Sequence, residues 1–336
     1  MYKMKNVVSN PNANAFTVLP SGEIVIKDNK GVRLLNQDKY FFEDPYPLQF
    51  NVFDDKIMIT DMHVQYYIMN ASDKQLVEKG KGRGFFDINA SDKYLGIVII
   101  EEKKYEFGLL NKEMQLVSKW ERNTHGTTNL MVQDTLIVLE SLNKAFAVEA
   151  GNDKPVWEFS FLSLGNDVKF SQFSGAYENK AVITLNNGGV VILDAKSGTL
   201  LKYWDNTKLR WWLMQSEANS PVFYGLSNET FIEIDVNKQE LIRQIDISKQ
   251  LQQSAGDFAF VSASRIENGL IYFIGGKKFI GVFDPGDASI KWVKQPAFKS
   301  KGTVLPAAKE NIQIVGKEIY VMDSAGDLHI YEPDNN

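Results

Sequence analysis

Three histidines are the residues best suited to acid–base or metal chemistry in this chain, and all three lie near expected strands. His63 and His125 fall in two connections, and Asp61 lies two residues before His63. Together they could hold a metal ion for hydrolase or lyase chemistry. They lack the close ligand spacing of known metal motifs, so solvated loop histidines are the competing interpretation. His329 alternates within an expected strand, where a packing or cross-strand role is expected.

Other catalytic chemistry finds little support. The chain has no cysteine, which excludes disulfides, thiolate nucleophiles and cysteine-ligated zinc. No G-x-S-x-G elbow is present. The stretch from Lys79 to Gly84 is rich in glycine and cations, but it lacks the strand-to-helix context of a phosphate loop. It is better interpreted as a flexible, positively charged connection.

Aspartates are abundant, and paired carboxylates of the glycosidase kind stay open because their separation in space is invisible in the sequence. For most of them turn chemistry is expected, since aspartate side chains accept hydrogen bonds from backbone N–H groups two or three residues on. Five stand where such turns are expected: Asp28, Asp73, Asp194, Asp235 and Asp284.

The elements that must position these residues are β-hairpins. The clearest runs from Asn186 to Trp204, where β-branched residues alternate with turns rich in Gly, Asn and Asp. Hairpins of this design recur about every 40 residues, the repeat length of four-stranded propeller blades. Eight begin near Glu23, Lys56, Tyr94, Thr135, Ala181, Pro221, Leu270 and Glu318.

Each hairpin has a further short strand before it, and all but the last have one after it, so the unit is strands a, b, c and d. The last unit ends after its third strand, and the segment Tyr2–Val8 is an unassigned strand. We therefore predict one all-β domain spanning residues 1–336, an eight-bladed β-propeller whose N-terminal strand closes the ring. Seven blades are the alternative because the first unit is short.

The unit resembles the repeat of the PQQ-like, quinoprotein-type propellers. Leu193, Asp194 and Ala195, then Gly198 and Trp204, carry the resemblance, with weaker echoes near Trp157 and Trp292. The quinone-binding enzymes of that family use a disulfide over the cofactor, which this chain cannot form. The resemblance therefore implies the branch without a cofactor, which includes non-catalytic scaffolds.

Composition narrows the class of protein. Hydrophobic residues make up 44% of the 336 residues, which is ample for a core. The formal charge of −5 argues against nucleic acid as the main partner. No segment is apolar over the length of a membrane span, and the first residues do not form a secretory signal. A cytoplasmic location is expected, although an exported protein whose signal had been removed would look the same.

The expected loops segregate charge. In propellers the b–c and d–a connections share one face, and here they are rich in lysine, arginine and aromatic residues, whereas the opposite face is richer in acid. This favours a non-enzymatic scaffold that binds a protein with an acidic surface, such as an immunity or antitoxin-type protein. The predicted partner-binding residues are Lys81, Arg83, Lys208, Arg210, Trp211, Phe298 and Lys299. The alternative is a metal-dependent hydrolase or lyase using Asp61, His63 and His125.

Overall fold

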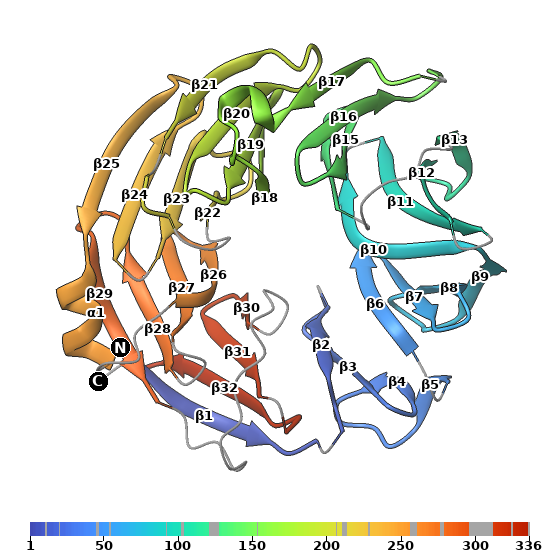
Figure 1. Ribbon diagram of the computed structural model, residues 1–336. Coiled ribbons are helices and arrows are strands. Elements are labelled where there is room, and N and C mark those ends of the chain that lie inside the picture. The colour runs from blue at the N-terminus through green and yellow to red at the C-terminus, as the bar shows by residue number, and fades with distance from the viewer. Residues whose placement is uncertain are drawn as a thin grey trace. The chain divides into compact units, whose positions relative to one another are not determined.

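The computed structural model consists almost entirely of strands, arranged in eight four-stranded antiparallel sheets. It describes residues 1–334 except 11, 20, 45–46, 54, 92, 102–103, 121–127, 153, 206, 210–213, 228, 256–260, 276–278, 296–311 and 324. The element order is that of an eight-bladed β-propeller, as the sequence predicts, and eight rather than seven sheets are present in the described residues (Figure 1).

The first four blades follow one another along the chain. Their strands are β2 (Ala15–Val18), β3 (Ile24–Asp28), β4 (Gly31–Leu34) and β5 (Tyr40–Glu43); β6 (Pro47–Phe53), β7 (Lys56–Asp61), β8 (Gln65–Asn70) and β9 (Leu76–Lys81); β10 (Arg83–Ala90), β11 (Tyr94–Glu101), β12 (Lys104–Asn111) and β13 (Leu116–Trp120); β14 (Asn129–Val132), β15 (Thr135–Ser141), β16 (Lys144–Glu149) and β17 (Trp157–Ser160).

The other four blades continue the pattern. Their strands are β18 (Phe170–Tyr177), β19 (Lys180–Leu185), β20 (Val190–Asp194) and β21 (Leu200–Trp204); β22 (Met214–Gln215), β23 (Val222–Leu226), β24 (Thr230–Asp235) and β25 (Glu240–Asp246); β26 (Val261–Glu267), β27 (Leu270–Gly275), β28 (Phe279–Asp284) and β29 (Ser289–Lys294); β30 (Ile312–Val315), β31 (Glu318–Met322), β32 (Leu328–Pro333) and β1 (Tyr2–Val8).

The last blade contains both ends of the chain. β1 pairs antiparallel with β32, so the N-terminal segment supplies the fourth strand of the eighth sheet, as predicted (Figure 1). The pairing begins with Tyr2 opposite Pro333 and ends with Val8 opposite Leu328. Lys5 forms ion pairs with Glu318 and Glu332 across the sheet. The strand that closes this blade is thus held by backbone pairing and by charge.

The described residues form two compact units. One holds Met1–Leu48, Leu226–Phe231 and Ile245–Asn336, and the other holds Gln49–Gly225 and Ile232–Gln244. Two short helices interrupt the strands within them. The helix α1 (Ser248–Ala255) packs beside β29, and the 3₁₀ turn η1 (Phe161–Leu164) follows β17.

The core lies between neighbouring blades, where strands b and c carry nearly continuous apolar runs. One cluster joins blades 4 and 5 and includes Ile137, Ala147, Ile183 and Leu193, all of them fully buried. The outer strands instead alternate with solvent, as the burial of β25 shows. Alternation on strand d and continuous burial on strands b and c follow from the position of each strand in the stack of sheets.

Tryptophans on outer strands fasten one blade to the next. The indole Nε1 of Trp157 donates to the carbonyl of Ala195 at 2.7 Å, and that of Trp120 donates to the carbonyl of Asn152 at 2.7 Å. Gly198 makes room for the first contact, since a Cβ there would meet the Trp157 ring at 2.6 Å. The Asp–Ala–Gly turn that carries the family resemblance thus receives the tryptophan of the preceding blade.

Candidate functional site

The loop edge of a blade is the edge that holds its b–c turn and the connection from its strand d to the next blade. In blade 2 the b–c turn is organised by Asp61, whose side chain is only 1% exposed. Its Oδ1 accepts hydrogen bonds from the N–H groups of His63 at 2.8 Å and Gln65 at 2.9 Å. This buried carboxylate holds Met62 and His63 outward, where both are exposed.

The second connection of this loop edge is a single residue. β9 ends at Lys81 and β10 begins at Arg83, with Gly82 between them at a φ of +85°. The N–H of Gly82 donates to the carbonyl of Val64 at 2.8 Å, which joins the two connections. The prediction of a flexible loop from Lys79 to Gly84 is therefore wrong. These residues belong to the end of β9 and the start of β10, and only Gly82 lies between the two strands.

Lys81 and Arg83 differ in their surroundings, although both were predicted to contact a partner. Lys81 is exposed. Arg83 is half-buried, with its guanidinium 5.0 Å from the centre of the Tyr66 ring. Its Nη1 lies 3.3 Å from Glu78 Oε1, an oxygen that also accepts from the Tyr66 hydroxyl at 2.6 Å. Arg83 therefore serves the contact between its own blade and the preceding one.

The alternative metal site does not assemble in the described residues. Asp61 points inward, His63 is exposed, and His125 lies outside the described residues. Among the residues that the structure describes, no group of three or more His, Asp or Glu side chains could hold a metal ion. The geometry of the described residues therefore adds no support to the hydrolase or lyase interpretation.

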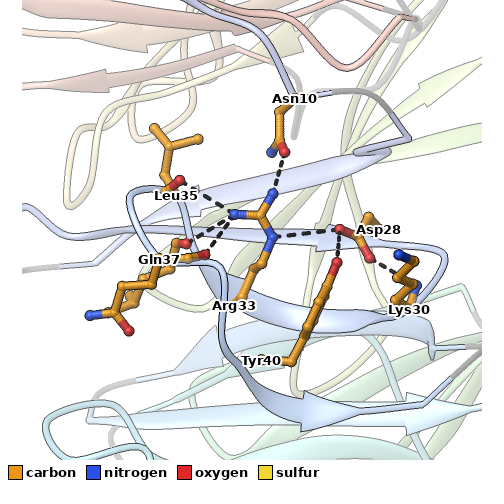
Figure 2. A network of polar contacts seen from close by, with 8 residues as sticks. Asn10, Asp28, Lys30, Arg33, Leu35, Gln37 and Tyr40 are labelled. Atoms are coloured by element: carbon orange, nitrogen blue, oxygen red, sulfur yellow. Dashed lines mark hydrogen bonds and ion pairs between the residues drawn. The ribbon is translucent and has the colours of Figure 1, made fainter.

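Blade 1 shows what an equivalent turn aspartate does. Asp28 Oδ1 accepts from the N–H of Lys30 at 2.8 Å, and its Oδ2 accepts from the Tyr40 hydroxyl at 2.7 Å. Arg33 Nε lies 3.7 Å from the same Oδ2, while Nη2 donates to Asn10 Oδ1 (Figure 2). Burial, and then the hydrogen bond to Asp28, raise the pKa of Tyr40. This network joins the β1–β2 connection to blade 1.

Blade 8 repeats the arrangement with a histidine. Asp323 Oδ1 accepts from the N–H groups of Ala325 at 2.9 Å and Asp327 at 3.0 Å, and Oδ2 lies 3.0 Å from His329 Nε2. Both side chains are almost fully buried, which confirms the packing role expected for His329. Burial alone would raise the pKa of Asp323, but the His329 contact and the two N–H groups lower it below its usual value.

The other predicted turn aspartates also act as expected. Hydrogen bonds from backbone N–H groups reach the side chains of all five residues predicted to make them. Acids at the edge opposite the loop edge are in part neutralised, because Lys93 pairs with Asp134 at 2.6 Å and Lys238 with Asp235 at 3.3 Å. Both sets of carboxylates therefore have structural partners.

The loop edge of blade 4 exposes two leucines that the sequence analysis did not select. Leu142 and Leu162 are 44% and 43% exposed. The N–H of Phe161 donates to the carbonyl of Asn143 at 2.8 Å, and that of Phe170 donates to the carbonyl of Leu142 at 2.7 Å. The d–a connection thus lies against its own b–c turn. The sequence does contain a signal for this exposed site, because Leu142 is an apolar residue inside the polar turn Ser141–Leu142–Asn143.

Blade 5 is covered by its own connection at this edge. Thr207 N–H and Oγ1 both donate to the carbonyl of Gly188, at 3.0 and 2.6 Å. A Cβ on Gly188 would lie 2.8 Å from the carbonyl oxygen of Leu209. The Asn187–Gly189 tip is thus largely buried within the blade. Lys208, one of the predicted residues, is exposed beside it with a φ of +60°.

The remaining predicted partner-binding residues lie outside the described residues. They are Arg210, Trp211, Phe298 and Lys299. Of the predicted set, the structure therefore places Lys81, Arg83 and Lys208, each at the loop edge of its own blade. Among the described residues, no helix combines the length and the apolar character that crossing a membrane requires.

Comparisons with solved structures agree on the fold. The chain is similar to BamB from Moraxella catarrhalis, with a TM-score of 0.65, 10% identity, and coverage of 99% of this chain and 100% of that one. It is also similar to the C-terminal WD40 domain of Sif2 (TM-score 0.69, 12% identity, coverage of 100% and 99%) and to Sqt1 of Saccharomyces cerevisiae (TM-score 0.63, 10% identity, coverage of 99% and 98%). The structural similarity shows a β-propeller fold. Because the sequence identities are this low, the similarity says nothing about activity.

Comparisons of sequence found no relative. No protein-family model matches the chain, and no curated protein matches it in sequence. The likeness to BamB and to a WD40 domain places the chain among β-propellers, while the PQQ-like repeat rests on the residues around Asp194 and on the weaker echoes near Trp157 and Trp292.

Proposed function

We propose that this protein is a non-enzymatic scaffold that binds another protein through the loop edges of its blades. The observation that carries the proposal is the loop edge of blade 4, where Leu142 and Leu162 stand exposed on a hydrogen-bonded frame. A backbone that hydrogen bonds already hold in place has less conformational freedom to lose on binding, which favours association.

The frame extends to the next blade. Asn186 Oδ1 accepts from the N–H of Lys169 at 2.7 Å, and its Nδ2 donates to the carbonyl of Asp167 at 3.0 Å. The side chains of Asp167 and Lys169 are both exposed, and they lie in the same connection as Leu162. An apolar centre with a polar rim is the usual anatomy of a protein-binding surface.

Partner capture tests the proposal. Tagged protein, returned to the cells that produce it, is purified with and without the double substitution Leu142→Asp/Leu162→Asp. The matched control is Val156→Asp/Leu200→Asp, which alters two equally exposed side chains away from the loop edges. We expect a specific partner to be lost with the first variant and kept with the control. Equal recovery from both would contradict the proposal.

The same capture experiment tests the predicted partner-binding cations. We expect the charge reversal Lys208→Glu/Arg210→Glu to weaken capture if the partner surface is acidic, and to do so less at high salt. An immunity or antitoxin role is the more specific form of the proposal. It requires the captured protein to be an effector whose activity falls when this chain is added in equimolar amount.

A further inference from the structure

We infer that the blade-2 tip, meaning the turn Asp61–Gln65 together with Lys81, binds a protein segment that carries carboxylates beside apolar side chains. The inference rests on the proposed scaffold function and names the chemistry of its partner. Three properties of the tip carry it: an exposed apolar side chain, a fixed backbone and an exposed lysine that makes no ion pair with the described residues.

The apolar element is Met62. Its side chain is 61% exposed, more than that of any other large hydrophobic residue in the described part of the chain except Met1. Methionine is flexible and polarisable, so it adapts to apolar partner groups of different shape. A methionine held in this turn therefore presents more than half of its surface to a partner.

The backbone beneath it is fixed and strained. Val64 has a φ of +58°, in the left-handed region that β-branched residues rarely adopt. The turn keeps this conformation because Asp61 accepts two backbone hydrogen bonds and Gly82 donates to the Val64 carbonyl. Strain of this kind persists where the surroundings impose it, and it clusters at functional sites.

Asp61 itself is unusual among the turn aspartates. In blades 1 and 8 the second oxygen of the equivalent aspartate meets Arg33 or His329. Each of these residues lies on strand c and pairs with the strand-b residue two positions before the aspartate. In blade 2 that position is Tyr67, and Asp61 Oδ2 is buried with no hydrogen bond to any described residue. The carboxylate therefore serves the turn alone, and its burial keeps it out of direct contact with a partner.

The charge exposed at the tip is positive. Lys81 is exposed, and in the described part of the chain its side chain makes no ion pair or hydrogen bond. Two carboxylates of the same blade are already engaged, because Asp61 is buried and Glu78 binds Tyr66 and Arg83. At blade 4, by contrast, Asp167 and Lys169 are both exposed. Selectivity for acidic segments is therefore assigned to blade 2.

Binding of defined peptides to the full chain tests the inference. The probes are fluorescein-labelled eight-residue peptides that alternate glutamate with leucine, lysine with leucine, or glutamate with serine, followed by fluorescence anisotropy. We expect the glutamate–leucine peptide to bind best. Met62→Ser should weaken it about tenfold by removing buried apolar surface. Lys81→Glu should weaken binding of the glutamate–leucine peptide about fivefold and should strengthen binding of the lysine–leucine peptide.

The controls separate this inference from the proposed function. Each variant is first shown to keep the wild-type unfolding temperature, and Leu142→Ser should leave peptide binding unchanged. The inference is overturned if the glutamate–leucine peptide does not bind, if lysine–leucine binds wild type equally well, or if Met62→Ser and Lys81→Glu behave as wild type. Loss of partner capture in Leu142→Asp/Leu162→Asp would then still support the scaffold, whereas unchanged capture would remove both.

Discussion

Asp28, Asp61 and Asp323 occupy the same place in three blades, and their second carboxylate oxygens meet different surroundings. Each first oxygen accepts backbone N–H groups of its own turn. Arginine and tyrosine serve the second oxygen in blade 1, histidine serves it in blade 8, and no described residue bonds to it in blade 2. A repeat thus keeps the residue that shapes the turn while its partners diverge.

At Asp323 the consequence is a dependence of stability on pH. Its pKa is lower in the folded protein than the ordinary value of 3.8, so its charge stabilises the fold above that pH and ceases to do so as pH falls. We expect Asp323→Asn to lower the free energy of unfolding at pH 7 by about 2 kcal/mol, and by less at pH 3. Urea unfolding at both pH values measures this.

Asp73→Asn is the matched control for that measurement. Asp73 also accepts a backbone N–H, from Gln75 at 2.9 Å, but it is exposed and makes no hydrogen bond to a histidine among the described residues. Its substitution should change stability little at either pH. A loss at Asp323 that is the same at pH 3 and pH 7 would contradict the assignment of the effect to its charge.

Gly198 gives a second prediction at this scale. It has a φ of +69°, and a Cβ would meet the Trp157 ring at 2.6 Å. We expect Gly198→Ala to destabilise the protein by about 3 kcal/mol, because conformational strain adds to a clash between blades. Gly151→Ala is the control, since Gly151 has a φ of +80° with nothing within 4 Å. Its cost should be about 1 kcal/mol. Equal losses in the two thermal melts would refute the clash.

At the scale of elements, β1 depends on contacts with the other end of the chain. It pairs with β32 alone, its Lys3 and Lys5 meet acids of β31, β32 and the C-terminal end, and Tyr2 lies 5.6 Å from Trp292. Next to it, Asn10 is fastened by Arg33, and Ser9 donates to Asp327 at 2.6 Å. The segment is therefore held once as a strand and again as a connection.

Removal of residues 1–8 should expose the edge of β32. We expect the truncated protein to melt at lower temperature and to associate as its concentration rises, because an unpaired edge accepts strands from other molecules. A synthetic peptide of residues 1–8, added in excess, should restore the melting temperature. Light scattering and thermal unfolding measure both effects, and a truncated protein that stays monomeric at wild-type stability would show that β1 is dispensable.

At the scale of the whole molecule, the sequence predicts those structural features that depend on residues close together along the chain. Turn aspartates and hairpins follow from patterns within one repeat, and the number of blades follows from how often that repeat recurs. Contacts between blades do not follow, because the indole of Trp157 meets a carbonyl 38 residues away. Arg83 shows the same limit. Its charge is plain in the sequence, but its burial against Tyr66 depends on how two sheets pack.

The meeting of both ends in one sheet has a practical consequence. The N–H of Asp334 donates to the carbonyl of Met1 at 2.7 Å, at the edge of blade 8 away from its b–c turn. Anything tethered to either end, whether a tag, a surface or a fused enzyme, is therefore attached at a single point. That point leaves the loop edge of its blade unobstructed, so the protein can be immobilised or displayed by either end with the same orientation.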